Sequence, residues 1–405
     1  MKFNTLGDFE VDGKTVFVRV DVNSPIDPDT REILDDNRII KCQDTIKELS
    51  ERDAKVVVLA HQGRPGSDDF TTMEKHAEKM SEIYGKEVNY IDDTFGPAAR
   101  QRIEEMEKGE ILLLENARFY SEEVLNRDPE VQAKTHLVRK LSPLGDLFVN
   151  NAFAAAHRSQ PTLVGFGVGL PAIAGRLMEE ELKGLGKARN PEHPCVYLLG
   201  GAKAEDSIEL ADHVLERDIA DKVLIGGLVG QVMLAAKGVN LGDSNMELIE
   251  EEGFKQEIEN AEALLSKYDE SRIKLPKDVR VETNGGKAEV VSVSDLPVDD
   301  PIYDIGDETI KEYAEIIEDS KTVVANGPVG VFEKEPFAKG TNELLRALGE
   351  TEAYTVIGGG HMVASARRQN ATDKIDHVST GGGSLLSFLS GEKLPVVEML
   401  EKAAK

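Results

Sequence analysis

Short runs of apolar residues alternate along the chain with longer segments in which apolar residues recur every three or four positions. Each short run has the length and the β-branched composition of a buried strand. The predicted strands lie at 15–23, 55–60, 111–116, 146–151, 195–201, 222–227, 322–327 and 353–360. A predicted helix lies at 38–52, with its apolar stripe at Ile39, Cys42, Ile46 and Leu49. Strands separated by helices favour an α/β fold with parallel sheets and right-handed crossovers.

Glycine interrupts this alternation at 165–175. Directly afterwards, apolar residues at helical spacing predict a helix that Pro171 can start and that ends near Gly186. The G-x-G-x-G run follows no good strand, so it is not a dinucleotide fingerprint. We expect two doubly wound, Rossmann-like parallel-sheet domains joined by a hinge helix. The predicted ranges are 1–168 with about 390–405 for the first domain, 169–188 for the connecting helix and 189–389 for the second domain.

The composition fits a globular enzyme in a reducing compartment. The 405 residues suggest two or three domains, and 40% of them are hydrophobic. No stretch approaches the length of a membrane span, and the N-terminus has no secretion signal, so we expect no membrane partner. The two cysteines, Cys42 and Cys195, cannot build a disulfide framework or a zinc site, which favours the cytoplasm.

The chain is strongly acidic, with 48 lysines and arginines against 75 aspartates and glutamates and a net charge of −27. Nucleic-acid backbones need a basic surface, so general nucleic-acid binding is excluded. The acidic residues are spread along the chain, which is typical of solvated helix faces. Adaptation to a salty cytoplasm, where ions screen self-repulsion, is the alternative interpretation.

Cationic side chains follow the strands of the first half, where ligands of open α/β sheets bind. Arginine matches the geometry of phosphate and carboxylate groups, so these residues predict a small, multiply anionic ligand. A structural ion pair within the sheet is the alternative for the first strand. Arg38 stands in the first turn of a helix, where a bound anion would offset the unfavourable helix dipole. The candidate ligand-binding residues are Arg19, Asp21, Asn23, Arg38, His61, Arg64, Arg118 and Arg158.

Glycine-rich turns follow the strands of the second half. They read LGGAK (199–203), IGGLVG (225–230), ANGPVG (325–330), IGGGH (357–361) and STGGGS (379–384). Glycine lets backbone N–H groups approach phosphate oxygens, and the last turn leads into a helix N-terminus. One double glycine is more often a plain turn, but the five together predict one nucleotide site. The Walker motif and the protein-kinase motif set are both absent from the sequence.

These two halves suit phosphoryl transfer, in which positioning and charge stabilisation supply most of the catalysis. The first domain would hold the anionic substrate through arginines, and the second would hold a nucleotide through backbone amides and Lys203. Sites on separate domains require closure, which also expels water from the reacting groups.

The sequence resembles the phosphoglycerate kinase family over essentially its whole length. The motifs, in the order of the family, are RVDVNSP (19–25), AHQGRP (60–65), LLENARF (113–119), AAAHR (154–158), GGAK (200–203), NGPVGVFE (326–333) and HVSTGGGS (377–384). The AHQGRPG and GGHMVA variants are similar to the archaeal branch. The resemblance implies in-line transfer, on domain closure, of the acyl phosphate of 1,3-bisphosphoglycerate to ADP, giving 3-phosphoglycerate and ATP. It also implies Mg²⁺, held largely through the nucleotide phosphates, and a monomer is favoured over an oligomer.

The resemblance assigns phosphoglycerate to the first domain and the nucleotide to the second. Arg38 resembles the catalytic arginine that neutralises the phosphoryl group in flight. Glu333 resembles the residue that takes the ribose hydroxyls, and the residues from about 390 return to the first domain. The catalytic residues by resemblance are Arg38, Lys203, Gly381 and Gly382. The nucleotide-binding residues by resemblance are Gly200, Gly201, Ala202, Lys203, Gly226, Gly227, Asn326, Pro328, Glu333, Gly359, Gly360, His361 and Gly383.

Two positions depart from the pattern of the family. Ser207 stands where most members have a second lysine, and His361 stands where they have the aspartate that binds magnesium. A neutral imidazole is a poor magnesium ligand, because Mg²⁺ prefers oxygen. The metal ligand is therefore unassigned, and Asp304 is a candidate on its position alone.

Two other classes of function are alternatives. A nicotinamide oxidoreductase would need a G-x-G-x-x-G turn followed by a ribose-binding acid, which the sequence lacks. A non-catalytic sensor of nucleotide or phosphoglycerate would explain Ser207 and His361, but it would not require all of the arginines. Turnover of 3-phosphoglycerate and ATP separates these alternatives.

Overall fold

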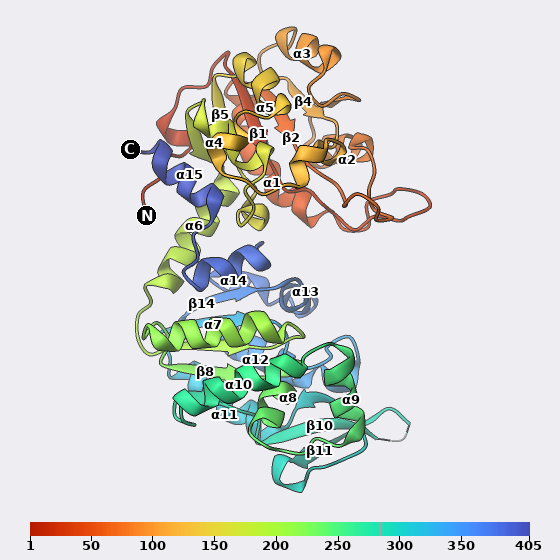
Figure 1. The fold of residues 1–405 in the computed structure, drawn as a ribbon, viewed down its shortest axis with the longest axis vertical. Helices are drawn as coiled ribbons and strands as arrows, with labels where there is room; N and C mark the ends of the chain where they lie inside the picture. Colours follow the sequence, from red (N-terminus) through yellow and green to blue (C-terminus); the bar gives the residue numbers. More distant parts are fainter. Residues whose placement is uncertain (284) are drawn as a thin grey trace. The chain divides into compact units, whose positions relative to one another are not determined.

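The computed structural model describes residues 1–283 and 285–405. They form two compact units, one of residues 1–183 with 393–405 and the other of residues 184–392 (Figure 1). Helix α6 (Arg176–Arg189) is continuous and contributes to both units. Helix α15 (Pro395–Ala403) belongs to the first unit, where the Val396 amide donates to Ala156 O at 3.3 Å.

The first unit is built on a six-stranded parallel sheet in the order β3-β4-β2-β1-β5-β6. These strands are β1 (Thr15–Arg19), β2 (Lys55–Leu59), β3 (Val88–Ile91), β4 (Ile111–Leu114), β5 (Leu147–Asn150) and β6 (Ala172–Ala174). The alternation of valine and isoleucine on one face buries α1 (Asn37–Glu51) and α2 (Glu74–Tyr84) against the sheet. On the other face, Phe17 and Phe148 stack on Phe166 with ring centroids 5.1 and 5.4 Å away. Three shorter helices complete the unit, namely α3 (Pro97–Glu104), α4 (Pro129–Gln132) and α5 (His136–Leu141).

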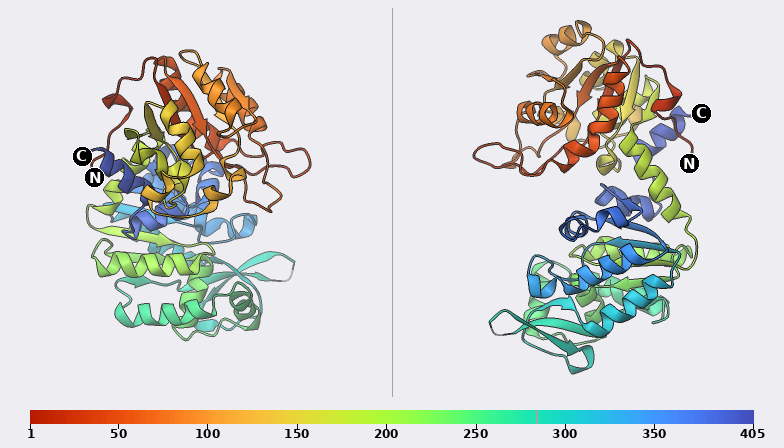
Figure 2. Two further views of the ribbon diagram at one scale, coloured as in Figure 1. Left: turned by 45° about the horizontal axis from the view of Figure 1, so that its top comes forward. Right: turned by 180° about the vertical axis from the view of Figure 1, so that it is seen from behind.

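The second unit has a six-stranded parallel sheet in the order β15-β14-β13-β7-β8-β9. These strands are β7 (Cys195–Leu199), β8 (Lys222–Ile225), β9 (Ile273–Lys274), β13 (Thr322–Asn326), β14 (Tyr354–Gly358) and β15 (His377–Val378). Its helices are α7 (Ala204–Glu216), α8 (Gly227–Ala236), α9 (Asp243–Glu251), α10 (Lys255–Lys267), α11 (Asp307–Glu318), α12 (Lys339–Glu350), α13 (Gly360–Arg368) and α14 (Gly383–Leu389). Helices α11, α12 and α13 pack on one face of the sheet through a common apolar core. Figure 2 shows the two units from further sides.

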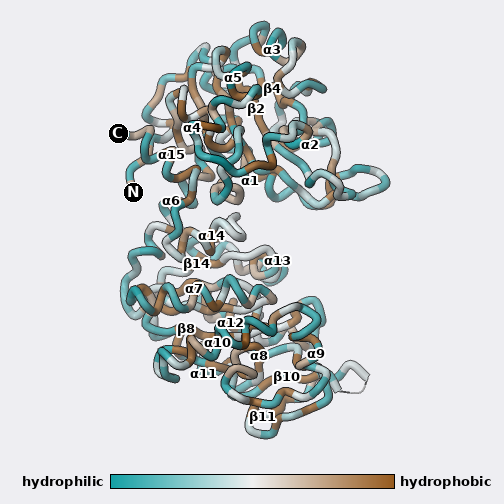
Figure 3. The backbone as a smooth tube through the Cα atoms, in the orientation of Figure 1, coloured by the Kyte–Doolittle hydropathy of each residue, from teal (hydrophilic) through white to brown (hydrophobic). Residues whose placement is uncertain are grey.

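The predicted α/β class with two parallel-sheet units is confirmed. Apolar segments concentrate in the strands, whereas apolar and polar residues alternate along α7 (Figure 3). This contrast reflects the different burial of the elements, since central parallel strands are covered on both faces and helices on one. The predicted helix at 38–52 is confirmed as α1, and its four apolar positions are buried.

The predicted helix start at Pro171 is wrong. Residues Ala172–Ala174 form β6 and pair in parallel with β5, and α6 begins only at Arg176. Its first amides donate to Thr45 Oγ1 at 2.8 Å and to Asn151 Oδ1 at 3.0 Å. These capping groups are distant in sequence, so the local pattern could not place the helix start.

Two further differences concern strands. The first strand ends at Arg19 rather than residue 23, because the Asp21 carboxylate accepts from the Asn23 amide and turns the backbone locally. An antiparallel sheet that the hydrophobic pattern did not predict has the order β11-β10-β12, formed by β10 (Asp278–Thr283), β11 (Lys287–Ser292) and β12 (Ile302–Ile305). Within the described parts of the chain, no helix is both long and apolar enough to span a bilayer.

Candidate functional site

Arg19 is the last residue of β1, and its side chain is fully buried. Its Nε donates to Thr162 Oγ1 at 2.8 Å, and its Nη2 contacts His61 Nδ1 at 2.8 Å. Thr162 in turn donates from its hydroxyl and its amide to Glu123, which is also fully buried. Arg19 therefore lies behind His61, and this burial contradicts the expectation that Arg19 itself touches a ligand.

The contact with Arg19 determines where His61 carries its proton. A guanidinium can only donate hydrogen bonds, so His61 Nδ1 must accept, and the proton of the neutral ring lies on Nε2. Burial and the charge of Arg19 hold the pKa of His61 well below its usual range. His61 is therefore a neutral hydrogen-bond donor and not a cation.

Asp21 and Arg38 form an ion pair of 2.8 Å, with Asp21 nearly buried and the Arg38 side chain 44% exposed. Burial favours the neutral acid, but the charges of Arg38 and Arg19 outweigh burial and lower the pKa of Asp21 to about 2. Asp21 thus offsets the unfavourable position of Arg38 in the first turn of α1. The carboxylate fixes one edge of a guanidinium that is still open to solvent.

Side-chain amides tie together the turns that follow β1, β2 and β4. The Gly63 amide donates to Asn23 Oδ1 at 2.8 Å, and Asn116 Nδ2 donates to Gln62 O at 2.8 Å. Asn116 Oδ1 accepts from the amide of Arg118 at 3.1 Å. These bonds bring the ends of three strands into one constellation, as the parallel topology predicted.

The remaining arginines of the first unit act on one another electrostatically. Burial, followed by the charges of Arg158 and Arg19, lowers the pKa of Arg118 to about 10. Burial also lowers the pKa of Arg158, with further lowering by Arg64 and Arg38 against the opposing effect of Asp21. Like charges at close range destabilise one another unless an anion lies between them. The structure thus brings Arg38, Arg64, Arg118 and Arg158 into one positive region.

The double-glycine turns of the second unit pack against one another. The amides of Gly200 and Gly201 donate to Asn326 O and Pro328 O at 2.9 and 2.7 Å, and those of Gly226 and Gly227 donate to Leu199 O and Val329 O, both at 3.0 Å. A Cβ on Gly200 would lie 2.4 Å from Pro328 O. These four amides therefore serve loop packing and are not free to donate to a phosphate.

These packed turns form the rim of a cavity of about 250 Å³ in the second unit. Six residues of the predicted nucleotide set line it, namely Gly201, Ala202, Gly227, Pro328, Glu333 and His361. The rest of its wall is largely apolar and includes Leu228, Leu248, Val279 and Ile302. A narrow apolar cavity with a few polar groups suits a purine base.

The other predicted nucleotide residues lie outside that cavity. These residues are Gly200, Lys203, Gly226, Asn326, Gly359, Gly360 and Gly383, and the predicted catalytic residues Gly381 and Gly382 also lie outside it. Lys203 precedes α7 with its side chain 67% exposed, and Gly360 and Gly383 begin α13 and α14. The Gly381 amide donates to Ser379 Oγ at 3.1 Å. Asn326 Oδ1 is buried without a hydrogen-bond partner, which leaves an acceptor at the end of β13.

The positions that depart from the family pattern have different surroundings. Ser207 is fully buried one turn after Lys203, and its Oγ has no hydrogen-bond partner. His361 is exposed in the first turn of α13. A lysine at 207 would have to enter the interior of the unit, so its replacement by serine suits the local packing.

Asp304 is not a ready magnesium ligand, contrary to the sequence-based hypothesis. Its side chain is 0% exposed, and its two oxygens accept from the amides of Gly340 and Ile305 at 2.7 and 2.9 Å. Burial raises its pKa to about 7 despite these amides. Over residues 1–283 and 285–405, no three histidine, cysteine, aspartate or glutamate side chains gather to hold a metal. The described residues therefore offer no carboxylate cage for Mg²⁺.

The site also contains residues to which the sequence pattern assigned no role, namely Glu123, Thr162, Gln62 and Asn116. Asn116 follows a strand in the run ENARF, so its position could have signalled a role. Glu123 and Thr162 lie outside any strand end, and only their burial beside Arg19 identifies them.

An arginine-rich strand edge in one doubly wound unit and an apolar cavity in the other suit an α/β phosphotransferase. The family model described as "Phosphoglycerate kinase" matches residues 6–392. The chain belongs to the phosphoglycerate kinase family.

Individual relatives and solved structures agree with this assignment. Phosphoglycerate kinase of Methanothermus fervidus is 51% identical over 100% of this chain and 98% of its own length. That of Methanobacterium bryantii is 52% identical over 99% of this chain and 97% of its own length. The crystal structure of phosphoglycerate kinase from Pyrococcus horikoshii superimposes with a TM-score of 0.92 at 44% identity, covering 99% of both chains. The similarity to archaeal members predicted from the motifs is confirmed.

Proposed function

We propose that this chain catalyses reversible phosphoryl transfer between 1,3-bisphosphoglycerate and ADP, giving 3-phosphoglycerate and ATP. Membership of the phosphoglycerate kinase family supports the reaction. The single structural observation that carries it is the group of mutually repelling arginines at the carboxyl edge of the first sheet. A ligand with a phosphate at one end and a carboxylate or acyl phosphate at the other would neutralise that group.

In the first unit, we assign ligand binding to Arg64, Arg118 and Arg158. His61 donates from Nε2 to a ligand oxygen, and Arg19 holds the ring in that tautomer. Asp21 orients Arg38 and keeps it charged, and the open edge of the Arg38 guanidinium stabilises the charge that develops on the transferring phosphoryl group.

In the second unit, the adenine base occupies the apolar cavity, and Glu333 at its rim takes the ribose hydroxyls. Lys203 and the starts of α13 and α14 face the phosphates. Because no carboxylate cage is present in the described residues, we propose that Mg²⁺ arrives bound to the nucleotide. Closure of the two units would bring the reacting groups in line and exclude water.

A coupled assay with 3-phosphoglycerate, ATP and magnesium tests the proposal. Turnover that saturates with both substrates is the expected result. Binding of both substrates without turnover would contradict it and would favour the sensor that Ser207 and His361 otherwise suggest.

A further inference from the structure

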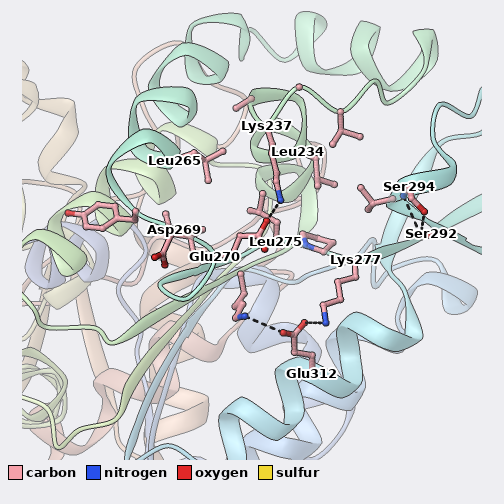
Figure 4. Close-up of a pocket in the computed structure, with 18 residues that line it drawn as sticks. Leu234, Lys237, Leu265, Asp269, Glu270, Leu275, Lys277, Ser292, Ser294 and Glu312 are labelled. Atoms are coloured by element: carbon pink, nitrogen blue, oxygen red, sulfur yellow. Dashed lines mark hydrogen bonds and ion pairs between the residues drawn. The ribbon is translucent and has the colours of Figure 1, made fainter.

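A second and larger cavity, of about 660 Å³, lies in the nucleotide unit (Figure 4). It is formed by the C-terminal ends of α8 and α10, by β9 with the following turn, and by residues around 292–294. None of the residues predicted for substrate or nucleotide lines it. Two of its wall residues, Leu234 and Pro276, also line the purine-sized cavity, so the two cavities share a wall.

The chemistry of this second cavity combines apolar surface with ammonium groups. Its wall includes Leu265, Leu275 and the ring of Tyr268. Three lysines surround these apolar groups, with Lys237 at the end of α8 and with Lys274 and Lys277 on either side of Pro276. A hollow of this size with a few charged groups on an apolar wall has the features of a small-molecule site.

The lysines of this cavity form ion pairs with carboxylates, and a bound anion would take the place of those carboxylates. In Figure 4, Lys237 reaches Glu270, and Lys277 reaches Glu312. The Lys237 and Glu270 side chains are 47% and 81% exposed, and exposed pairs of this kind contribute little stability. An anion bound on the apolar wall would therefore replace Glu270 at Lys237 at small cost. At Lys277 it would replace Glu312, which also pairs with Lys274 and would keep that partner.

We propose that this cavity binds a small organic anion with an apolar body. We also propose that its occupancy increases the affinity of the adjacent, smaller cavity for the nucleotide. The anion contacts Lys237 and Lys277, while its apolar body packs on Leu234 and Pro276. Leu234 and Pro276 form the wall between the two cavities, so a ligand in the larger cavity and a purine in the smaller one contact the same side chains. Each ligand therefore restricts the motion of this wall and favours binding of the other. The location of the site is independent of the proposed function, and only the coupling rests on the nucleotide occupying the smaller cavity.

The test uses 8-anilinonaphthalene-1-sulfonate, an aromatic sulfonate, as the probe of the full-length protein. We expect one probe molecule per chain, with an affinity that ADP increases by about threefold or more. Coupling between sites is reciprocal, so the probe should lower the dissociation constant of ADP by the same factor. Lys237→Ala/Lys277→Ala should weaken probe binding about tenfold, because two charge contacts are lost. A Lys237→Gln/Lys277→Gln variant removes the same two charges but keeps longer side chains in the wall, and probe binding should weaken in it as well.

The matched control is Lys255→Ala/Lys311→Ala, which removes two exposed lysines of α10 and α11 outside the cavity. Probe affinity should be unchanged in that variant. Displacement of the probe by ADP would place it in the purine cavity and overturn the site. Equal probe affinity in the cavity and control variants would also overturn it, and an affinity indifferent to ADP would overturn the coupling. None of these readouts uses turnover, so an inactive protein would contradict the proposed function without affecting this test.

Discussion

In the unit of residues 1–183, the candidate site consists of charged side chains, whereas in residues 184–392 it consists of backbone turns and apolar side chains. The arginines of the first unit are held by hydrogen bonds and ion pairs such as Asp21 with Arg38. In the second unit, glycine amides donate hydrogen bonds to neighbouring turns, and these turns border an apolar cavity. Loss of a charge should therefore impair ligand handling in the first unit, and loss of a glycine should impair stability in the second.

The largest effect is expected for Arg38→Ala. The guanidinium meets charge that develops during transfer, so kcat should fall about 10²- to 10³-fold. The KM for 3-phosphoglycerate should change far less. Steady-state kinetics of the wild type and the Arg38→Ala variant would show this. Arg38→Lys, which keeps the charge without the planar fork, should recover part of the loss. A rise in KM with an unchanged kcat would contradict the role.

Gly200→Ala should produce the next largest effect, and it concerns stability. The new Cβ would lie 2.4 Å from Pro328 O, so two packed turns must move apart at a cost of about 2–3 kcal/mol. Gly360→Ala is the matched control, because its Cβ would meet nothing within 4 Å. Thermal unfolding of the two variants should differ accordingly, and equal midpoints would contradict the packing account.

The sequence predicted both sheets and the arginine group because hydrophobic period and strand-end position are local features. It could not show that Arg19 faces inward, because the partners Thr162 and Glu123 are distant in sequence. Likewise, Gly201 and Gly227 line the apolar cavity, but only contacts between turns reveal that their amides are already used. The antiparallel sheet was missed because β11 is largely exposed and has no apolar run.

Asp21 should make the first unit sensitive to acid. Its pKa is lowered from 3.8 to about 2, so its contribution to stability is present above pH 4 and is lost as pH falls towards 2. The shift corresponds to about 2 kcal/mol. Denaturant unfolding from pH 5 to pH 2.5 should show a steeper loss in the wild type than in Asp21→Asn. Parallel curves for the two proteins would rule out the linkage.

The smallest effect is expected for Thr162→Val, which removes the hydroxyl between Arg19 and Glu123. Arg19 should then hold His61 less firmly, so the KM for 3-phosphoglycerate should rise several-fold, which corresponds to about 1 kcal/mol. Nitrogen-15 NMR of the His61 ring should show the Nε2–H tautomer in the wild type and a mixture in the variant.

Thr135→Val serves as its control, because that hydroxyl is also buried but donates to Gln132 O. The Thr135→Val variant should lose about as much folding stability as Thr162→Val. It should leave the KM for 3-phosphoglycerate and the His61 tautomer unchanged. Identical His61 spectra in the wild type and Thr162→Val would mean that Thr162 is structural only.

The most direct test of the contrast between the two units is calorimetric titration of Arg118→Ala with 3-phosphoglycerate and, separately, with adenosine. The account predicts that 3-phosphoglycerate binds about tenfold or more weakly than to the wild type, because a buried guanidinium is lost from the anion site. Adenosine should bind with unchanged affinity, since it occupies the apolar cavity of the other unit. An unchanged affinity for 3-phosphoglycerate, or an equal loss for adenosine, would contradict the account.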